Sequence, residues 1–176
     1  MAITYHGDMD LSIIDEIPKN RKKIITKIIN DKRLIKVYTF MKEEIAAGRQ
    51  CIIVFPLVEE TKKSDLAAAT EGYEKLKQLF NNVSLGLIHG KMKNSDKETI
   101  MENFENNNIN ILVSTTVIEV GIDVPNASVI LIENSERFGL TQLHQLRGRV
   151  GRGEAKSYCI LVERNVSKNS KKLSTN

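Results

Sequence analysis

Short runs of apolar residues alternate along this chain with longer segments in which apolar positions recur at helical spacing. The short runs are rich in β-branched residues, which is typical of strands buried on both faces of a sheet. They lie at 24–29, 51–55, 83–88, 111–113, 129–132 and 158–162. The helical segments lie at 34–47, 66–80, 95–106 and 140–146. Strands that alternate with helices predict an α/β fold, with a mostly parallel sheet and helices on both faces.

Local signals mark several boundaries of these elements. Gly48 favours a helix end, and Pro56 follows the apolar run at 51–55. Ser95 and Glu98 have the spacing of a capping box, which predicts that Ser95 caps the helix at 95–106. In parallel sheets, ligands gather at the loops that follow the carboxyl ends of the strands. We therefore expect the chemistry of this domain in those loops.

The two ends of the chain differ in composition from its middle. Residues 1–21 are polar and mixed, with a strand-like stretch only at Leu11–Ile14, and they are predicted to be a connector that enters the domain. Residues 166–176 are rich in Ser, Lys and Asn, which predicts a flexible tail. Residues 22–165 are predicted to form one compact domain, because they are numerous enough to bury a substantial core.

Composition narrows the class of protein without identifying it. Apolar residues make up 41% of the 176 residues and charged residues 27%, which is ordinary for a soluble globular protein. No apolar run is long enough for a membrane helix, and the start of the chain lacks the pattern of a secretory signal, so we expect no membrane partner. The net charge of +4 is compatible with a phosphate-rich partner.

The two cysteines, Cys51 and Cys159, lie far apart in the sequence, each in a strand-like apolar run. A disulfide between them stays open at this point. Buried free thiols in a reducing compartment are the favoured interpretation.

Arginines and glycines alternate from Gln145 to Gly153, at the predicted end of a helix and in the loop beyond it. Glycines let the backbone approach a ligand closely. Arg149 and Arg152 are three residues apart, so on a helical turn both guanidinium groups could converge on one anion. Each guanidinium offers a planar fork of donors that matches phosphate, and such groups stabilise the transition state of phosphoryl transfer. The alternative is a solvated basic turn that pairs with surface acids.

These residues carry a resemblance to a known family. Gln145–Arg152 resembles motif VI of superfamily 2 helicases, Q-x-x-G-R-x-G-R, and 111–125 resembles motif V. Residues 87–92, with Lys97 and Phe104 after them, are similar to the region between motifs IV and V, and 51–55 occupies the place of motif IV. The resemblance implies a RecA-like domain, the second of the two that form a helicase motor.

The resemblance also implies roles for residues around ATP. Arg149 and Arg152 take the positions of arginine fingers, and Gln145 belongs to the same motif. Gly121 takes a position near the nucleotide, and Asp123 the position that accepts a hydrogen bond from its ribose. An Asp ahead of an apolar residue and a proline could equally be a turn former.

A second group of residues points to DNA. Ser114, Thr115 and Thr116 follow a predicted strand, and small hydroxylated residues there suit contact with a nucleic-acid backbone. The resemblance implies that Thr115 touches a DNA phosphate. The alternative is that these hydroxyls only satisfy local backbone groups.

The loop and helix after residue 88 add further candidates for DNA contact. Gly90 permits close approach of the backbone to phosphate, and His89 beside it is interpreted as an orienting residue. Lys97 occupies a place where related RNA helicases often carry Arg, so the resemblance implies a DNA contact, while a solvated helix lysine is the alternative.

The sequence lacks the other half of an ATPase site. No G-x-x-x-x-G-K-[ST] phosphate loop is present, and no Cys/His cluster has the spacing of a metal site. If the chain uses ATP and Mg²⁺, the Mg²⁺ ligands must therefore lie on the first motor domain. We expect this chain to be close to inert by itself.

Four segments are similar to RecG-type helicases in particular. They are 5–21, 118–121, 133–140 and 151–159. This resemblance implies a translocase of the bacterial cytoplasm that remodels branched DNA in repair and recombination, with a wedge domain and the first motor domain ahead of this one.

Other functions stay open. The transcription-repair coupling factor shares the segments 138–140 and 142–152 almost as well, so a translocase of that type is the nearest alternative. A non-enzymatic nucleic-acid-binding module with the same fold is another. An unrelated small metabolic enzyme would need an acid, a base or a nucleophile at the strand ends, and none is found.

Overall fold

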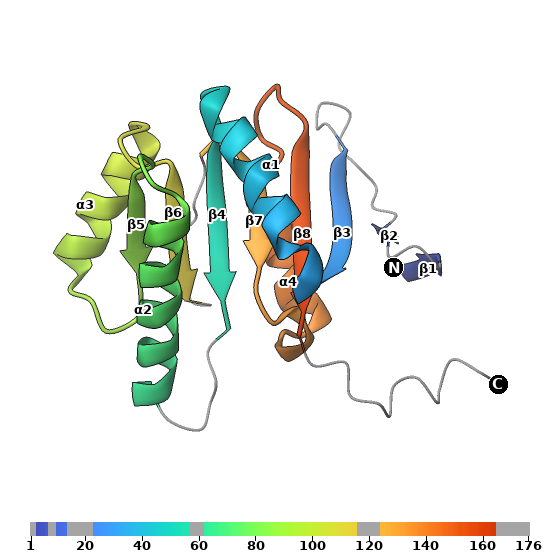
Figure 1. Cartoon of the computed structure of the whole chain (residues 1–176), viewed down its shortest axis with the longest axis horizontal. Helices are drawn as coiled ribbons and strands as arrows, with labels where there is room; N and C mark the ends of the chain where they lie inside the picture. Colours follow the sequence, from blue (N-terminus) through green and yellow to red (C-terminus); the bar gives the residue numbers. More distant parts are fainter. Residues whose placement is uncertain (1–2, 7–9, 14–22, 57–61, 116–123, 165–176) are drawn as a thin grey trace.

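The computed structural model describes residues 3–6, 10–13, 23–56, 62–115 and 124–164, and its main feature is a six-stranded sheet (Figure 1). The strand order is β3-β8-β7-β4-β6-β5, and every neighbouring pair is parallel. The strands are β3 (Ile24–Asn30), β4 (Gln50–Phe55), β5 (Leu85–Ile88), β6 (Ile111–Thr115), β7 (Ala127–Ile132) and β8 (Ser157–Glu163). The predicted α/β class and its parallel sheet are confirmed.

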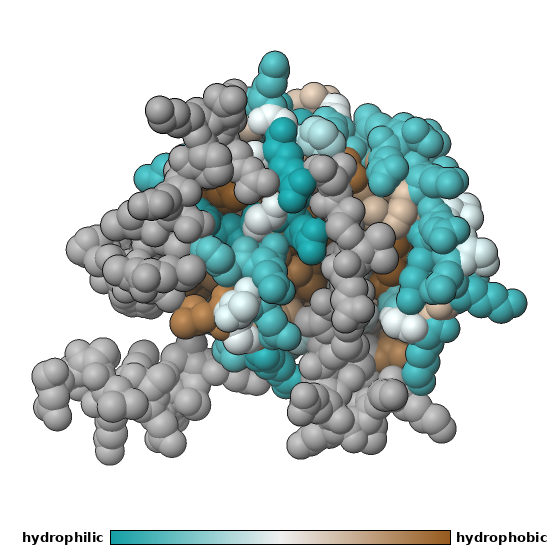
Figure 2. Space-filling model, turned by 180° about the vertical axis from the view of Figure 1, so that it is seen from behind, coloured by the Kyte–Doolittle hydropathy of each residue, from teal (hydrophilic) through white to brown (hydrophobic). Residues whose placement is uncertain are grey.

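Four helices cover the two faces of this sheet (Figure 1). They are α1 (Leu34–Ala46), α2 (Lys62–Leu79), α3 (Asn94–Glu105) and α4 (Leu140–Arg147), with short 3-10 turns at η1 (Asp31–Arg33) and η2 (Ser135–Arg137). One core cluster joins α1 and α2 to one face, and a second joins α3 and α4 to the other. The described surface on the α3 and α4 side is largely hydrophilic, because the apolar stripe of each helix faces the sheet (Figure 2).

The central strand β4 explains why apolar runs predict this sheet so well. Residues 51–54 are fully buried, since β4 has strands on both sides and helices on both faces. Cys51 and Ile53 pack towards α1 and α2, whereas Ile52 and Val54 pack towards α3 and α4. A strand buried on both faces needs apolar residues at every position, and the sequence shows that pattern.

Several element boundaries differ from the predictions. Helix α3 begins at Asn94 behind Lys93, so Ser95 lies inside its first turn, and the predicted capping box is wrong. The carbonyl of Lys93 already accepts from the N–H of Lys97, which leaves Ser95 no cap position. Helix α2 begins at Lys62, earlier than the predicted residue 66. Strand β6 extends through Thr115, because its pairing with β4 continues to that residue.

The N-terminal segment contains a small sheet of its own. Strands β1 (Ile3–His6) and β2 (Asp10–Ile13) pair antiparallel, where the sequence had suggested only one strand-like stretch. The role of residues 1–21 as a connector between domains stays a prediction. Residues 166–176 lie outside the described residues.

Both cysteines are free and buried, as predicted. Cys51 lies on β4 and Cys159 on β8, on opposite faces of the sheet. Burial raises the pKa of the Cys159 thiol to about 12, and burial also raises the pKa of Cys51. Neither thiol has the lowered pKa of a nucleophile.

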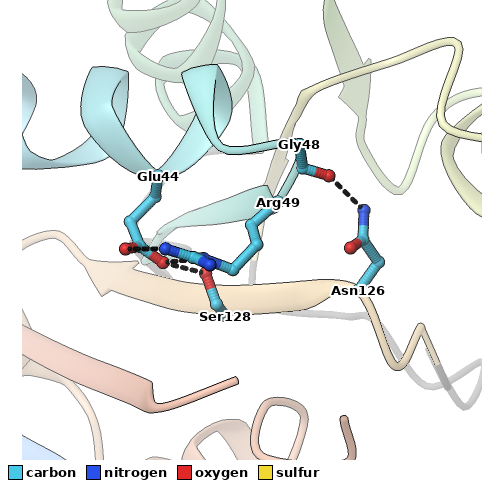
Figure 3. A network of polar contacts seen from close by, with 5 residues as sticks. All are labelled: Glu44, Gly48, Arg49, Asn126 and Ser128. Carbon is cyan, nitrogen blue, oxygen red and sulfur yellow. Dashed lines mark hydrogen bonds and ion pairs between the residues drawn. The ribbon is translucent and has the colours of Figure 1, made fainter. Parts of the chain in front are cut away.

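A buried carboxylate anchors the end of α1 to the sheet (Figure 3). Glu44 accepts two hydrogen bonds from the Arg49 guanidinium, at 2.6 and 2.7 Å, and one from the Ser128 hydroxyl at 2.7 Å. Ser128 can reach Glu44 because the register between β4 and β7 shifts by one residue beside it, so its side chain turns towards α1. The hydrogen bonds from Arg49 and Ser128 lower the pKa of Glu44.

We predict that Glu44→Gln lowers the free energy of unfolding by about 1–3 kcal/mol at pH 7. A carboxyl whose pKa is lowered in the folded state stabilises the fold above its ordinary pKa of about 4.3 and loses that contribution as the pH falls through the folded value. The difference between wild type and variant should therefore shrink below about pH 4. Urea unfolding of both proteins at pH 7 and below pH 4 measures this difference in stability. A difference that grows on acidification would contradict the lowered pKa of Glu44.

Candidate functional site

Two strands end side by side at the carboxyl edge of the sheet and carry the predicted DNA-binding residues. Ile88 at the end of β5 pairs with Ser114 of β6, and His89 and Gly90 follow directly after β5. The Nζ of Lys97, on α3, donates to the carbonyl oxygen of Gly90 at 3.5 Å. The structure thus brings Gly90 and Lys97 together beside the end of β6.

The space around these residues suits a large ligand. Gly90 is exposed, and apart from its chain neighbours no group of the described residues lies within 4 Å of the position that a Cβ would take there. Lys97 is half-buried, with exposed Lys91 and Lys93 in the same loop region. An open glycine backbone among lysines can accept an anionic chain such as a phosphodiester.

Ser114 and Thr115 are placed differently from the expectation. They belong to β6 instead of following it, and their exposed fractions are 1% and 3%. The Ser114 hydroxyl donates to the Thr115 carbonyl at 2.8 Å, so it satisfies a local backbone group. This bond agrees with the alternative that the Ser114 hydroxyl only satisfies a local backbone group, and a DNA contact of Ser114 stays a prediction. A phosphate contact of Thr115 stays a prediction, and Thr116 lies outside the described residues.

His89 has an unusual environment at this edge. Its Nδ1 is buried, and no hydrogen-bond partner for it exists among the described residues. Burial lowers the pKa of His89, and the charges of Lys97 and Lys91 lower it further. The charged imidazolium form is therefore disfavoured beside two cations.

The arginine-rich segment lies at the opposite edge of the sheet. We call residues 148–153 the arginine loop. Helix α4 returns the chain from the end of β7 to the start of β8, so the loop comes before a strand. A Cβ on Gly151 would lie 2.8 Å from Cγ1 of Ile24, and one on Gly153 would lie 2.3 Å from the carbonyl oxygen of Pro125. Ile24 begins β3 and Pro125 precedes β7, so this loop lies at the amino edge, away from the strand ends where the chemistry was expected.

The arginines of this segment fall into two kinds. Arg147 is 8% exposed, and its Nε donates to the Thr26 hydroxyl at 3.1 Å, which ties the end of α4 to β3. Arg149 is half-buried, and among the described residues no hydrogen bond or ion pair engages its guanidinium. Arg152 is exposed. The sequence did not distinguish Arg147 from the other arginines, because its burial depends on contact with β3, which is distant in the sequence.

The expected helical turn between Arg149 and Arg152 is not formed. Helix α4 ends at Arg147, and Gly151 takes a left-handed conformation with φ 83° that breaks the turn. Convergence of the two guanidinium groups on one anion therefore depends on the loop, and it stays a prediction. Gln145 is exposed in the last turn of α4.

The predicted nucleotide-binding residues Gly121 and Asp123 lie outside the described residues. The chain leaves β6 at the carboxyl edge with Thr115, and the next described residue, Val124, is buried in the same core cluster as Leu146 of α4. At roughly 3.3 Å per residue, strands of this length separate the two edges by about 15–20 Å.

The described part of the chain shows neither a metal site nor a membrane-spanning helix. No group of three or more His, Cys, Asp or Glu side chains there could hold a metal ion. In the same part of the chain, no helix combines the length and the apolar character needed to cross a membrane.

Comparison with known proteins gives the family. The profile of the helicase conserved C-terminal domain matches residues 30–154. An ATP-dependent DNA helicase RecG from Synechocystis sp. is 49% identical over 172 residues, which cover 97% of this chain and 21% of that protein. The RecG of Aquifex aeolicus is 50% identical over 171 residues, which cover 97% and 22%. This chain thus spans about a fifth of the length of these curated relatives.

Solved structures agree with the fold. The structure of RecG bound to a three-way DNA junction has a TM-score of 0.74 and 44% identity, covering 92% of this chain and 22% of that one. Domain 2 of the DEAD-box helicase Mss116p, bound to an RNA duplex, has a TM-score of 0.61 and 19% identity, covering 80% and 54%. The RecA-like fold is therefore confirmed.

We predict that the imidazole of His89 titrates below the ordinary histidine pKa of about 6.5. Lys97→Ala should raise this pKa, because one of the cations that disfavour the imidazolium is removed. An NMR titration of the imidazole protons measures both values. A normal pKa that is unchanged in Lys97→Ala would show that the lysine does not act on His89.

Proposed function

We propose that this chain, which belongs to the helicase conserved C-terminal domain family, is the second motor domain of an ATP-dependent helicase that remodels branched DNA. The observation that carries the proposal is the arginine loop. It presents an exposed Arg152 and a half-buried Arg149 whose guanidinium has no partner among the described residues. The half-buried guanidinium of Arg149 is therefore suited to bind an anion that another domain brings.

The anion we propose is the γ-phosphate of ATP. Arg149 and Arg152 stabilise the charge that develops in phosphoryl transfer, and Gln145, Gly121 and Asp123 contact the rest of the nucleotide. The Mg²⁺ ligands and the phosphate loop are assigned to the first motor domain, and a wedge domain is expected ahead of it. The named relatives are bacterial helicases, so we place the protein in the bacterial cytoplasm.

The DNA partner is assigned to the carboxyl edge. Gly90 and Lys97 lie in contact there, beside the end of β6 with Ser114 and Thr115. Lysines and open backbone contact phosphates without reading sequence, as a translocase requires. Branched DNA is proposed as the substrate because a similar protein, RecG, has been solved bound to a three-way junction. Thr116 is assigned to the same surface.

Removal of either arginine should abolish ATP hydrolysis by the full-length protein. For Arg149→Ala and Arg152→Ala we expect kcat to fall by about 10³-fold or more, the loss typical of an arginine finger. Steady-state hydrolysis with saturating junction DNA measures it. The matched control is Arg33→Ala, since Arg33 is an exposed arginine of η1 outside the proposed site. Full hydrolysis in both loop variants would refute the assignment of the arginine loop.

The chain alone should bind junction DNA weakly, with an affinity that falls as salt rises, because few phosphate contacts are available. Lys97→Ala should weaken this binding and reduce the dependence on salt by about one phosphate contact. The control is Lys75→Ala, which removes the same charge from α2, where Lys75 pairs with Glu71. Equal affinities of the two variants over a salt titration would exclude Lys97 from the interface.

A further inference from the structure

The turn that leads into β7 is held by the side chain of Asn126 (Figure 3). Its Nδ2 donates to the carbonyl oxygen of Gly48 at 2.9 Å and to Oε1 of Gln50 at 3.0 Å. Its backbone is fixed as well, since the Asn126 carbonyl oxygen accepts from the N–H of Gln50 at 3.0 Å. Asn126 is thus anchored to the segment that enters the central strand β4.

Gln50 is itself immobilised by its surroundings. It is fully buried, and its Nε2 donates to the carbonyl oxygens of Phe104 at 2.6 Å and Ile109 at 2.7 Å. With its Oε1 bound to Asn126, both the donors and the acceptor of this amide are used. A buried amide with every group satisfied has one favourable orientation, so Asn126 meets an acceptor that is fixed in place.

The anchored residue is bonded directly to the support of the arginine loop. Pro125 precedes Asn126, and the backbone of Gly153 rests so close to the Pro125 carbonyl oxygen that a Cβ would lie 2.3 Å from it. Gly151 lies close to the side chain of Ile24, since a Cβ there would be 2.8 Å from its Cγ1. Arg152 therefore lies between two glycines that both pack closely at the amino edge of the sheet, Gly151 on a side chain and Gly153 on the backbone.

From these contacts we propose that Asn126 is a positioning residue for the arginine loop. Its three hydrogen bonds fix the Pro125 carbonyl, and this carbonyl sets how far Arg152 reaches towards the nucleotide. The inference rests on the proposed function. Reacting groups must be held tightly, because a displacement of about 1 Å can reduce a rate about 100-fold.

The test is made in the full-length enzyme with Asn126→Asp and Gly153→Ala. Asn126→Asp keeps the size of the side chain but turns the donor into an acceptor that faces the Gly48 and Gln50 oxygens. Gly153→Ala leaves Asn126 intact and pushes the loop away from Pro125. For each variant we expect kcat for ATP to fall about tenfold to 100-fold, while KM for ATP and junction affinity stay within about twofold.

A double variant shows whether the two changes act on one feature. Asn126→Asp combined with Gly153→Ala should lose less than the product of the single losses, because both displace the same loop. Ser128→Ala is the matched control. It breaks a hydrogen bond to Glu44 two residues along the chain from Asn126, so it should lower the melting temperature without lowering kcat.

The outcomes separate this inference from the proposed function. Arg149→Ala and Arg152→Ala are assayed in parallel, and if they retain hydrolysis the proposed function itself fails. If they lose hydrolysis while the Asn126 and Gly153 variants keep kcat within about threefold, the positioning role is overturned. It is also overturned if Ser128→Ala loses as much kcat as Asn126→Asp at the same melting temperature. If Asn126→Asp does not fold, the kcat of Gly153→Ala is used alone, and a kcat within about threefold of wild type overturns the positioning role.

Discussion

The fully buried amide of Gln50 is the polar contact on which the arrangement of this domain depends. It lies at the first residue of the central strand, where no part of it is exposed, so its donors and acceptor must be satisfied within the protein. The carbonyls of Phe104 and Ile109 and the amide of Asn126 provide those partners. One side chain thereby joins the start of β4 to the end of α3 and to the turn that enters β7.

This arrangement gives the two edges of the sheet different tasks in the proposed motor. Gly90 and Lys97 offer an open, basic surface for DNA at the carboxyl edge, and the arginine loop offers guanidinium groups to ATP at the amino edge. The inner strands β4, β6 and β7 of the ladder between them are almost entirely buried, so they are closely packed on both faces. Helix α3 carries Lys97 near one edge, and the carbonyl of its Phe104 is bound to Gln50 at the other.

Much of the fold could be predicted from sequence, because strands buried on both faces leave uninterrupted apolar runs and helices leave a period. Ser114 and Thr115 were assigned to a loop because only the ladders with β4 and β5 show that the strand continues through them. The edge on which the arginine loop lies could be predicted from the sequence. In a parallel sheet, the chain after α4 must return to the start of β8, which is at the amino edge. The roles of Gln50 and Asn126 could not be predicted from the sequence, because polar residues at the start of a strand are usually exposed to solvent. Their partners lie as far as 59 and 78 residues away in the sequence.

The division of tasks between the two edges is tested most directly by a structure of the full-length protein with branched DNA and ADP–aluminium fluoride, which mimics the transition state of phosphoryl transfer. We expect the guanidinium groups of Arg149 and Arg152 within hydrogen-bond distance of the fluoroaluminate, and the DNA backbone beside Gly90 and Lys97. DNA lying along the arginine loop, or a fluoroaluminate that neither arginine contacts, would contradict this division.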